Sequence, residues 1–112
     1  LALGNLDSTR DWGHAKDYVK IMWQLLQLDD PGDYVCATGQ SHSVRELCDT
    51  TFRKLGMDYK EHVFQDPRFL RPAELNDLKG CTKKLAGVID LNFDYTFDTM
   101  IDEMINYWME KL

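Results

Sequence analysis

Glycine-rich turns are missing from this sequence, because its seven glycines never form the G-x-G-x-x-G pattern. That pattern lets backbone N–H groups approach the pyrophosphate of a dinucleotide, so nothing here predicts dinucleotide binding. Basic residues are also few. Thirteen Lys and Arg stand against 19 Asp and Glu, which gives a net charge of −6. Nonspecific binding of nucleic acid needs a basic face, so the composition excludes that function.

Long apolar runs and a signal-peptide pattern are absent as well, and we expect no membrane partner. The three cysteines, Cys36, Cys48 and Cys81, are odd in number and widely spaced, and no C-x-x-C occurs. This usage indicates reduced thiols in a cytoplasmic protein, without a disulfide frame or a zinc site. Each cysteine is expected to be a small buried side chain.

The pattern of apolar residues predicts three main helices joined by short strands. Helical spacing runs through residues 11–27, through the segment that follows Ser43, and through residues 96–112. Ser43 and Glu46 form the S-x-x-E capping box of the second helix, and Gly56 is placed to end it. His14, near the start of the first helix, is expected to cap or pack rather than to bind a metal. Along the first helix, the apolar stripe consists of Ala15, Val19, Met22, Trp23 and Leu26.

Between the helices, residues 34–38 and 59–65 are rich in β formers and are predicted strands. Pro31 and Gly32 suit the central positions of a type II turn. Residues 75–80 predict at best a short strand, and residues 82–87 a helix of one or two turns. The fold class is therefore α/β. Its strands are too few for a self-sufficient sheet, and the start at "LALGNLDSTR" has no Met. We therefore expect a lobe of a longer protein.

One pattern invites a catalytic interpretation. Tyr107 and Lys111 form Y-x-x-x-K at helical spacing, and an ammonium beside a tyrosine can lower the pKa of its hydroxyl. The pattern is short enough to occur by chance, it lies at the end of the sequence, and no glycine-rich turn accompanies it. We therefore favour an ordinary terminal turn of helix.

Two arginine-containing segments admit two interpretations each. "DPRFLRPAEL" (66–75) places Arg68 and Arg71 on a stretch stiffened by two prolines, either as a surface loop or as an anion site. "TRDWGHAKDY" (9–18) places Arg10 before a helix start. There it could bind a phosphate, or it could pair with Asp7 or Asp11 on the surface.

Three segments together carry a resemblance to a known family. "LGNLDSTRDWGHAKDYVKIMW", "DYVCATGQSHSVRE" and "DPRFLRPAELNDLKG" resemble the C-terminal part of GDP-mannose 4,6-dehydratases, which belong to the extended short-chain dehydrogenase/reductase superfamily. The likeness runs from residue 1 to about residue 80 and continues more loosely to the end. Residues 76–92 depart from the family pattern, with Cys81 where the family has an aspartate.

The resemblance implies substrate-binding roles for three residues. Arg10 and Arg71 would bind the nucleotide diphosphate, and Glu74 would accept hydrogen bonds from the ribose hydroxyls. Arg68 also matches the family motif, but bracing the loop against Asp66 or Asp77 is at least as good an interpretation. No catalytic, cofactor-binding or metal-binding residue is expected in this chain.

For the whole enzyme, the resemblance implies a lyase of GDP-fucose and deoxyhexose biosynthesis that converts GDP-mannose to GDP-4-keto-6-deoxymannose. Residues 1–112 would be the C-terminal substrate-binding lobe, inactive alone. Its partners would be GDP-mannose and an N-terminal Rossmann domain that carries NADP, in a dimer or tetramer. Two alternatives stay open: another nucleotide-sugar epimerase or reductase of the superfamily, and a non-catalytic α/β interaction module.

Overall fold

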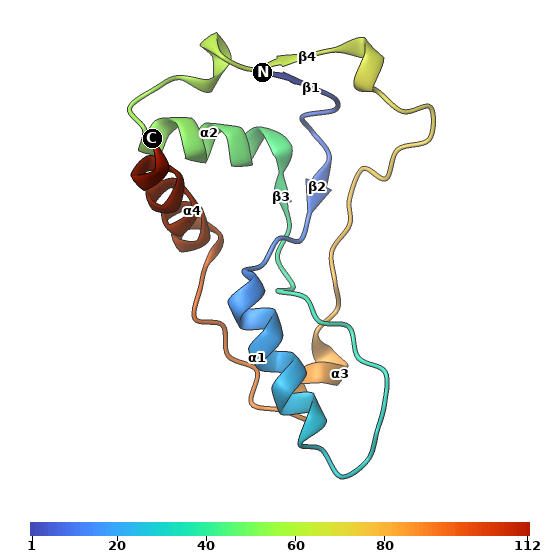
Figure 1. Ribbon diagram of the computed structural model, residues 1–112. Coiled ribbons are helices and arrows are strands. Elements are labelled where there is room, and N and C mark those ends of the chain that lie inside the picture. The colour runs from blue at the N-terminus through green and yellow to red at the C-terminus, as the bar shows by residue number, and fades with distance from the viewer.

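The computed structural model describes residues 1–112, which form α-helices, short 3₁₀ helices and very short strands (Figure 1). This mixture confirms the α/β prediction. The molecule is flat and elongated, 52 × 39 × 18 Å along its principal axes. No helix combines the length and the apolar character that a membrane crossing requires. In chain order the elements are β1 (Ala2–Leu3), β2 (Thr9–Arg10), α1 (Ala15–Leu26), β3 (His42–Ser43), α2 (Val44–Lys54), η1 (Tyr59–Glu61), β4 (Phe64–Gln65), η2 (Pro67–Phe69), α3 (Lys83–Ala86) and α4 (Phe97–Lys111).

The strands pair in two small sheets near the N-terminal segment. β1 runs parallel to β4, and β2 runs antiparallel to β3. A single parallel bridge joins Thr9 to Asp77, which is all that forms of the short strand predicted over residues 75–80. α3 confirms the short helix predicted just after it. These pairings hold residues 1–10 against β3, β4 and the segment at Asp77, all of which lie far along the chain.

The ends of α2 follow the predicted signals in part. Ser43 Oγ accepts a hydrogen bond from the Glu46 backbone N–H at 3.0 Å, which satisfies one free donor of the first turn. The Glu46 carboxylate, however, lies 2.9 Å from His42 Nδ1 and makes no bond to the Ser43 backbone, so only half of the capping box forms. At the other end Gly56 has a φ of 73°, which glycine adopts without strain, and it ends the helix as predicted.

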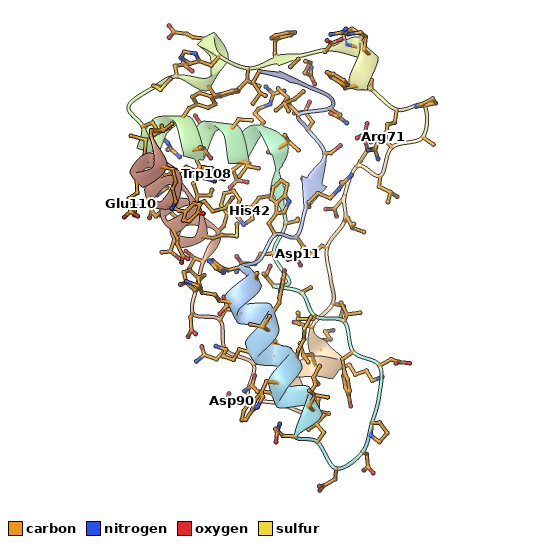
Figure 2. All side chains as sticks on the ribbon, in the orientation of Figure 1. Asp11, His42, Arg71, Asp90, Trp108 and Glu110 are labelled. Carbon is orange, nitrogen blue, oxygen red and sulfur yellow. The ribbon has the colours of Figure 1, made fainter.

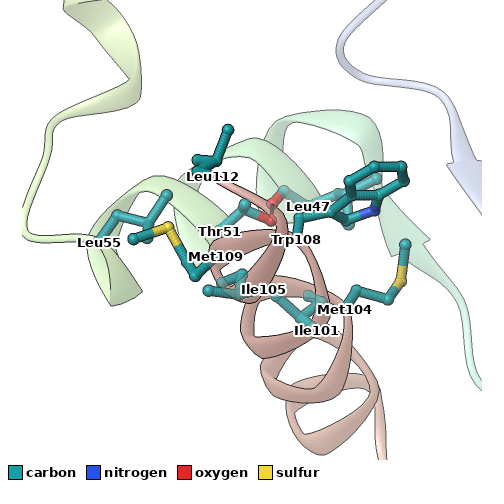
Figure 3. A pocket seen from close by; sticks show the side chains of 9 residues that line it. All are labelled: Leu47, Thr51, Leu55, Ile101, Met104, Ile105, Trp108, Met109 and Leu112. Atoms are coloured by element: carbon teal, nitrogen blue, oxygen red, sulfur yellow. Dashed lines mark hydrogen bonds between the residues drawn. The ribbon is translucent and has the colours of Figure 1, made fainter.

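The core lies where α2, η1 and the N-terminal segment meet. Leu6, Cys48, Tyr59 and Val63 are buried there, with Leu3, Val44 and Phe52 packed against them. α2 also packs on α4, and a groove of about 350 Å³ lies between these two helices (Figure 3). Apolar side chains from both helices line the groove. Several of those on α4 are open to solvent, Trp108 at 62% exposure among them.

α1 turns an unexpected face inward. Its buried residues are Asp17 and Ile21, whereas Val19, Met22, Trp23 and Leu26 of the predicted apolar stripe are exposed. The Asp17 carboxylate is 1% exposed and accepts hydrogen bonds from the backbone N–H groups of Asp94 and Tyr95, at 2.9 and 3.1 Å. A buried carboxylate with such partners is satisfied. Asp17 therefore joins α1 to the segment that leads into α4.

The N-terminal end of α1 is joined to α4 by a polar cluster around Glu103. His14 caps α1, because its Nδ1 accepts a hydrogen bond from the Lys16 backbone N–H at 3.0 Å, which confirms the expected capping role. Its Nε2 lies 3.2 Å from the Glu103 carboxylate, and the Lys16 ammonium donates to the same carboxylate at 2.7 Å. Hydrogen bonds from Lys16 and Tyr95 lower the pKa of Glu103 to about 2.

Of the predicted strands, the one over residues 34–38 is absent and the one over residues 59–65 forms only at its end. Residues 34–38 have no strand beside them and form no ladder. The N–H of Thr38 donates to the Asp11 side chain instead. Residues 59–65 begin as η1, because Asp58 Oδ1 accepts from the Lys60 N–H at 3.0 Å and caps a 3₁₀ turn. Only Phe64 and Gln65 pair as a strand.

Two smaller predictions also fail. A type II turn needs a positive φ at Gly32, yet the only residues with positive φ are Gly39 and Gly56, so no such turn forms. The cysteines are all free thiols, but only one is buried. Cys48 lies in the core, whereas Cys81 is exposed because it lies in the irregular segment before α3.

Candidate functional site

The segment that contains Glu74 runs alongside β2. The backbone N–H of Thr9 donates to the Asn76 carbonyl at 2.7 Å, and the N–H of Leu78 donates to the Thr9 carbonyl at 3.1 Å. The hydroxyl of Thr9 also bonds to the Asp77 carboxylate. Residues separated by more than 60 positions in sequence are thereby held side by side, and Arg10 lies next to the Glu74 turn.

Asp11 ties the chain around Arg10 to two other segments. Its Oδ1 accepts hydrogen bonds from the N–H and hydroxyl of Thr38. Its Oδ2 accepts from the N–H groups of Gly39, at 2.9 Å, and Gly80, at 3.2 Å. Partial burial raises the pKa of Asp11, but these four hydrogen bonds outweigh that effect and hold the pKa below its ordinary value. The carboxylate therefore stays ionised and fixes its neighbours.

Arg10 is held on one side only. Its Nη1 donates to the carbonyls of Thr9, at 2.7 Å, and Leu75, at 2.8 Å, while Nε and Nη2 make no bond within the chain. The surface pairing considered for Arg10 does not occur, since Asp7 pairs with Arg45 and Asp11 binds backbone groups. Arg10 is therefore oriented by the protein and keeps several guanidinium N–H groups free.

The three residues predicted to bind substrate line one cavity of about 410 Å³. Its lining consists of Leu3, Gly4, Asn5, Ser8, Arg10, Val44, Phe69, Arg71 and Glu74. Arg71 lies on the segment that passes beside β2 (Figure 2). Its guanidinium makes no ion pair or hydrogen bond within the chain. Gly4 permits the approach of η2, because a Cβ there would lie 2.7 Å from the Phe69 carbonyl oxygen.

The two arginines of "DPRFLRPAEL" have different roles in this geometry. The Arg68 guanidinium binds both carboxylate oxygens of Asp66: Nη2 donates to Oδ2 at 2.6 Å, and Nε lies 3.1 Å from Oδ1 and 3.0 Å from Oδ2. The same pair lowers the pKa of Asp66. Arg68 therefore braces the loop through Asp66, as expected, and not through Asp77. Only Arg71 of the two faces the cavity.

The remaining catalytic pattern does not form a catalytic pair. Lys111 Nζ lies over the Tyr107 ring, 5.1 Å from its centroid, rather than at the hydroxyl. Both residues lie in the exposed last turns of α4. An ordinary terminal turn, the favoured interpretation, fits this arrangement.

Sequence reasoning missed two polar residues of the cavity, Ser8 and Asn5. Ser8 is 3% exposed, and its hydroxyl donates to Glu74 Oε1 at 3.3 Å. The available signal was position: Ser8 stands two residues before Arg10, so the two side chains point to the same side of an extended segment. The contact itself joins residues 66 positions apart and has no local signature.

Solved structures and curated relatives resemble this chain in fold and in sequence. The chain superposes on RMD from Pseudomonas aeruginosa complexed with NADPH, with a TM-score of 0.87 at 21% identity. The superposition covers 100% of this chain and 36% of that one. The chain thus has the fold of about a third of that structure.

The particular family follows from sequence. The family model described as GDP-mannose 4,6 dehydratase matches residues 1–104. GDP-mannose 4,6 dehydratase 1 of Arabidopsis thaliana is 40% identical over 110 residues, and the human GDP-mannose 4,6 dehydratase is 38% identical over 128. These alignments cover 98% and 99% of this chain but 30% and 34% of the relatives. The chain belongs to the GDP-mannose 4,6-dehydratase family and spans about a third of the length of these relatives.

Replacing Asp11 tests the hydrogen bonds that orient the cavity. In Asp11→Asn one oxygen becomes an amide donor, so backbone N–H groups of Thr38, Gly39 or Gly80 lose their acceptor. A partly buried donor left without a partner costs up to the ~1–3 kcal/mol of a buried one, so exchange of these amides should speed up by about 5- to 150-fold. Amide hydrogen exchange measures this. Asp90→Asn, at an exposed position without bonding partners, is the matched control. Equal exchange in both variants would contradict the role given to Asp11.

Proposed function

We propose that this chain is the C-terminal, substrate-binding lobe of a GDP-mannose 4,6-dehydratase, and that it binds the GDP portion of GDP-mannose. The complete enzyme would convert GDP-mannose to GDP-4-keto-6-deoxymannose, a lyase reaction. The observation that carries the proposal is the convergence of Arg10, Arg71 and Glu74 on one cavity from segments more than 60 residues apart.

The residue types suit a nucleoside diphosphate. Arg10 and Arg71 have free guanidinium N–H groups, which form charge-assisted hydrogen bonds to phosphate oxygens. Glu74 is an acceptor-only partner when ionised, which matches a ribose diol. The chain has a net charge of −6, so a local pair of unpaired arginines is needed to attract an anion against the overall field. Binding the GDP portion would orient the sugar for the reaction, which takes place elsewhere in the enzyme.

The chemistry itself we assign to an N-terminal Rossmann domain outside these residues. NADP would supply hydride transfer there. The residues present do not fit that cofactor, because no glycine-rich turn occurs among them. Only 13 of the 112 residues are buried, and the unpaired segment 34–38 and the exposed apolar face of α1 are available to pack on such a domain. We expect the complete enzyme to be a dimer or tetramer.

Arg71→Ala in the full-length enzyme tests the diphosphate role. The variant should bind GDP-mannose more weakly by about 1.5–3 kcal/mol, the usual range for a hydrogen bond to a charged group. Isothermal titration calorimetry measures the change.

Arg68→Ala is the matched control, because the Arg68 guanidinium is held by Asp66 and does not line the cavity. It should leave the affinity near that of the wild type. An unchanged affinity in Arg71→Ala, or an equal loss in both variants, would exclude the role proposed for Arg71.

Residues 1–112 by themselves should show no dehydratase activity, because hydride transfer and acid–base catalysis are assigned to the other domain. The test is to incubate the isolated chain with GDP-mannose and NADP⁺ and to follow GDP-4-keto-6-deoxymannose by chromatography. The full-length enzyme serves as the positive control. Product formation by the isolated chain would refute the assignment of catalysis to the other domain.

A further inference from the structure

We propose that Ser8 is a positioning residue that orients the Glu74 carboxylate and so sets the selectivity of the site for nucleotides that carry the ribose hydroxyls over those that lack them. The inference rests on the proposed function, since it assumes that Glu74 accepts hydrogen bonds from ribose hydroxyls. It adds a residue and a specificity to that site. Its basis is a buried hydroxyl aimed at the carboxylate.

Ser8 is rigidly placed. It is 3% exposed, and its carbonyl accepts a hydrogen bond from the backbone N–H of Val44 at 3.1 Å. Val44 is the first residue of α2, so Ser8 is attached to the helix that packs on the core. A side chain held in this way by regular structure can fix the orientation of a group that lies on a loop.

Glu74 has no other anchor for its side chain. The bond from Ser8 Oγ to Oε1, at 3.3 Å, is its only hydrogen bond or ion pair. The backbone around it is held separately, by Arg10 at the Leu75 carbonyl and by Thr9 at the Asn76 carbonyl. The loop would therefore keep its course without the Ser8 hydroxyl, whereas the carboxylate would turn freely.

An oriented Glu74 carboxylate would strengthen the binding only of ligands that carry ribose hydroxyls. An ionised carboxylate offers about four acceptor positions on two oxygens. Ser8 occupies one of them on Oε1, which leaves Oε2 and the rest of Oε1 for a diol. Orienting the carboxylate before the ligand arrives removes the entropic cost of ordering it, which favours ligands that bear the hydroxyls. A nucleotide without ribose hydroxyls gains nothing from this orientation.

The test uses the full-length enzyme with two probes, GDP and 2′,3′-dideoxy-GDP, and measures both affinities by calorimetry. Ser8→Ala should weaken GDP binding by about two- to tenfold, as expected for loss of one hydrogen bond's contribution. It should leave the affinity for dideoxy-GDP unchanged. In a Glu74→Ala background, Ser8→Ala should have no further effect on either probe, because the two residues act through one interaction.

Ser41→Ala is the control for the loss of a serine hydroxyl, since Ser41 makes no side-chain hydrogen bond and does not line the cavity. Thermal unfolding of each variant identifies changes in stability. Equal weakening of both probes by Ser8→Ala, or no weakening of either, would overturn the inference. If Glu74→Ala keeps the wild-type preference for GDP, the ribose role of Glu74 fails and the inference fails with it. Arg71→Ala tests the diphosphate role separately.

Discussion

The carboxylate of Asp11 is the interaction on which the arrangement of this molecule depends. Three stretches without regular structure meet there: the residues after β2, the Thr38–Gly39 bend and the segment at Gly80. None of the three lies in a helix or a strand. Four hydrogen bonds to one charged acceptor supply the missing constraint, and charge-assisted bonds are stronger than neutral ones. Because Arg10 is the preceding residue, its direction follows from this anchor.

The cavity is basic in a chain whose net charge is −6 because the nearby acidic groups have other partners. Asp66 pairs with Arg68, Asp7 pairs with Arg45, and Asp11 binds backbone N–H groups. The two arginines that face the cavity consequently keep free donors. Arg10 and Arg71 can therefore create a local positive potential that attracts an anion, although the protein as a whole is acidic.

The sequence predicted those structural features that depend on residues close together in the chain. The main helices follow from apolar periodicity, the start of α2 from Ser43, and its end from Gly56. It failed where tertiary contacts or a short capping side chain decide, as at residues 34–38 and at Asp58. The cavity residues Arg10, Arg71 and Glu74 came from a family resemblance, and the structure brings them together. The contacts of Asp11 and Ser8 span up to 69 positions and leave no local pattern to detect.

The central claim is that this cavity holds the GDP portion of GDP-mannose. A crystal structure of the full-length enzyme with GDP-mannose tests it most directly. The account predicts diphosphate oxygens within hydrogen-bonding distance of the guanidinium groups of Arg10 and Arg71, and ribose hydroxyls at the Glu74 carboxylate. A nucleotide bound elsewhere, with this cavity empty, would contradict it.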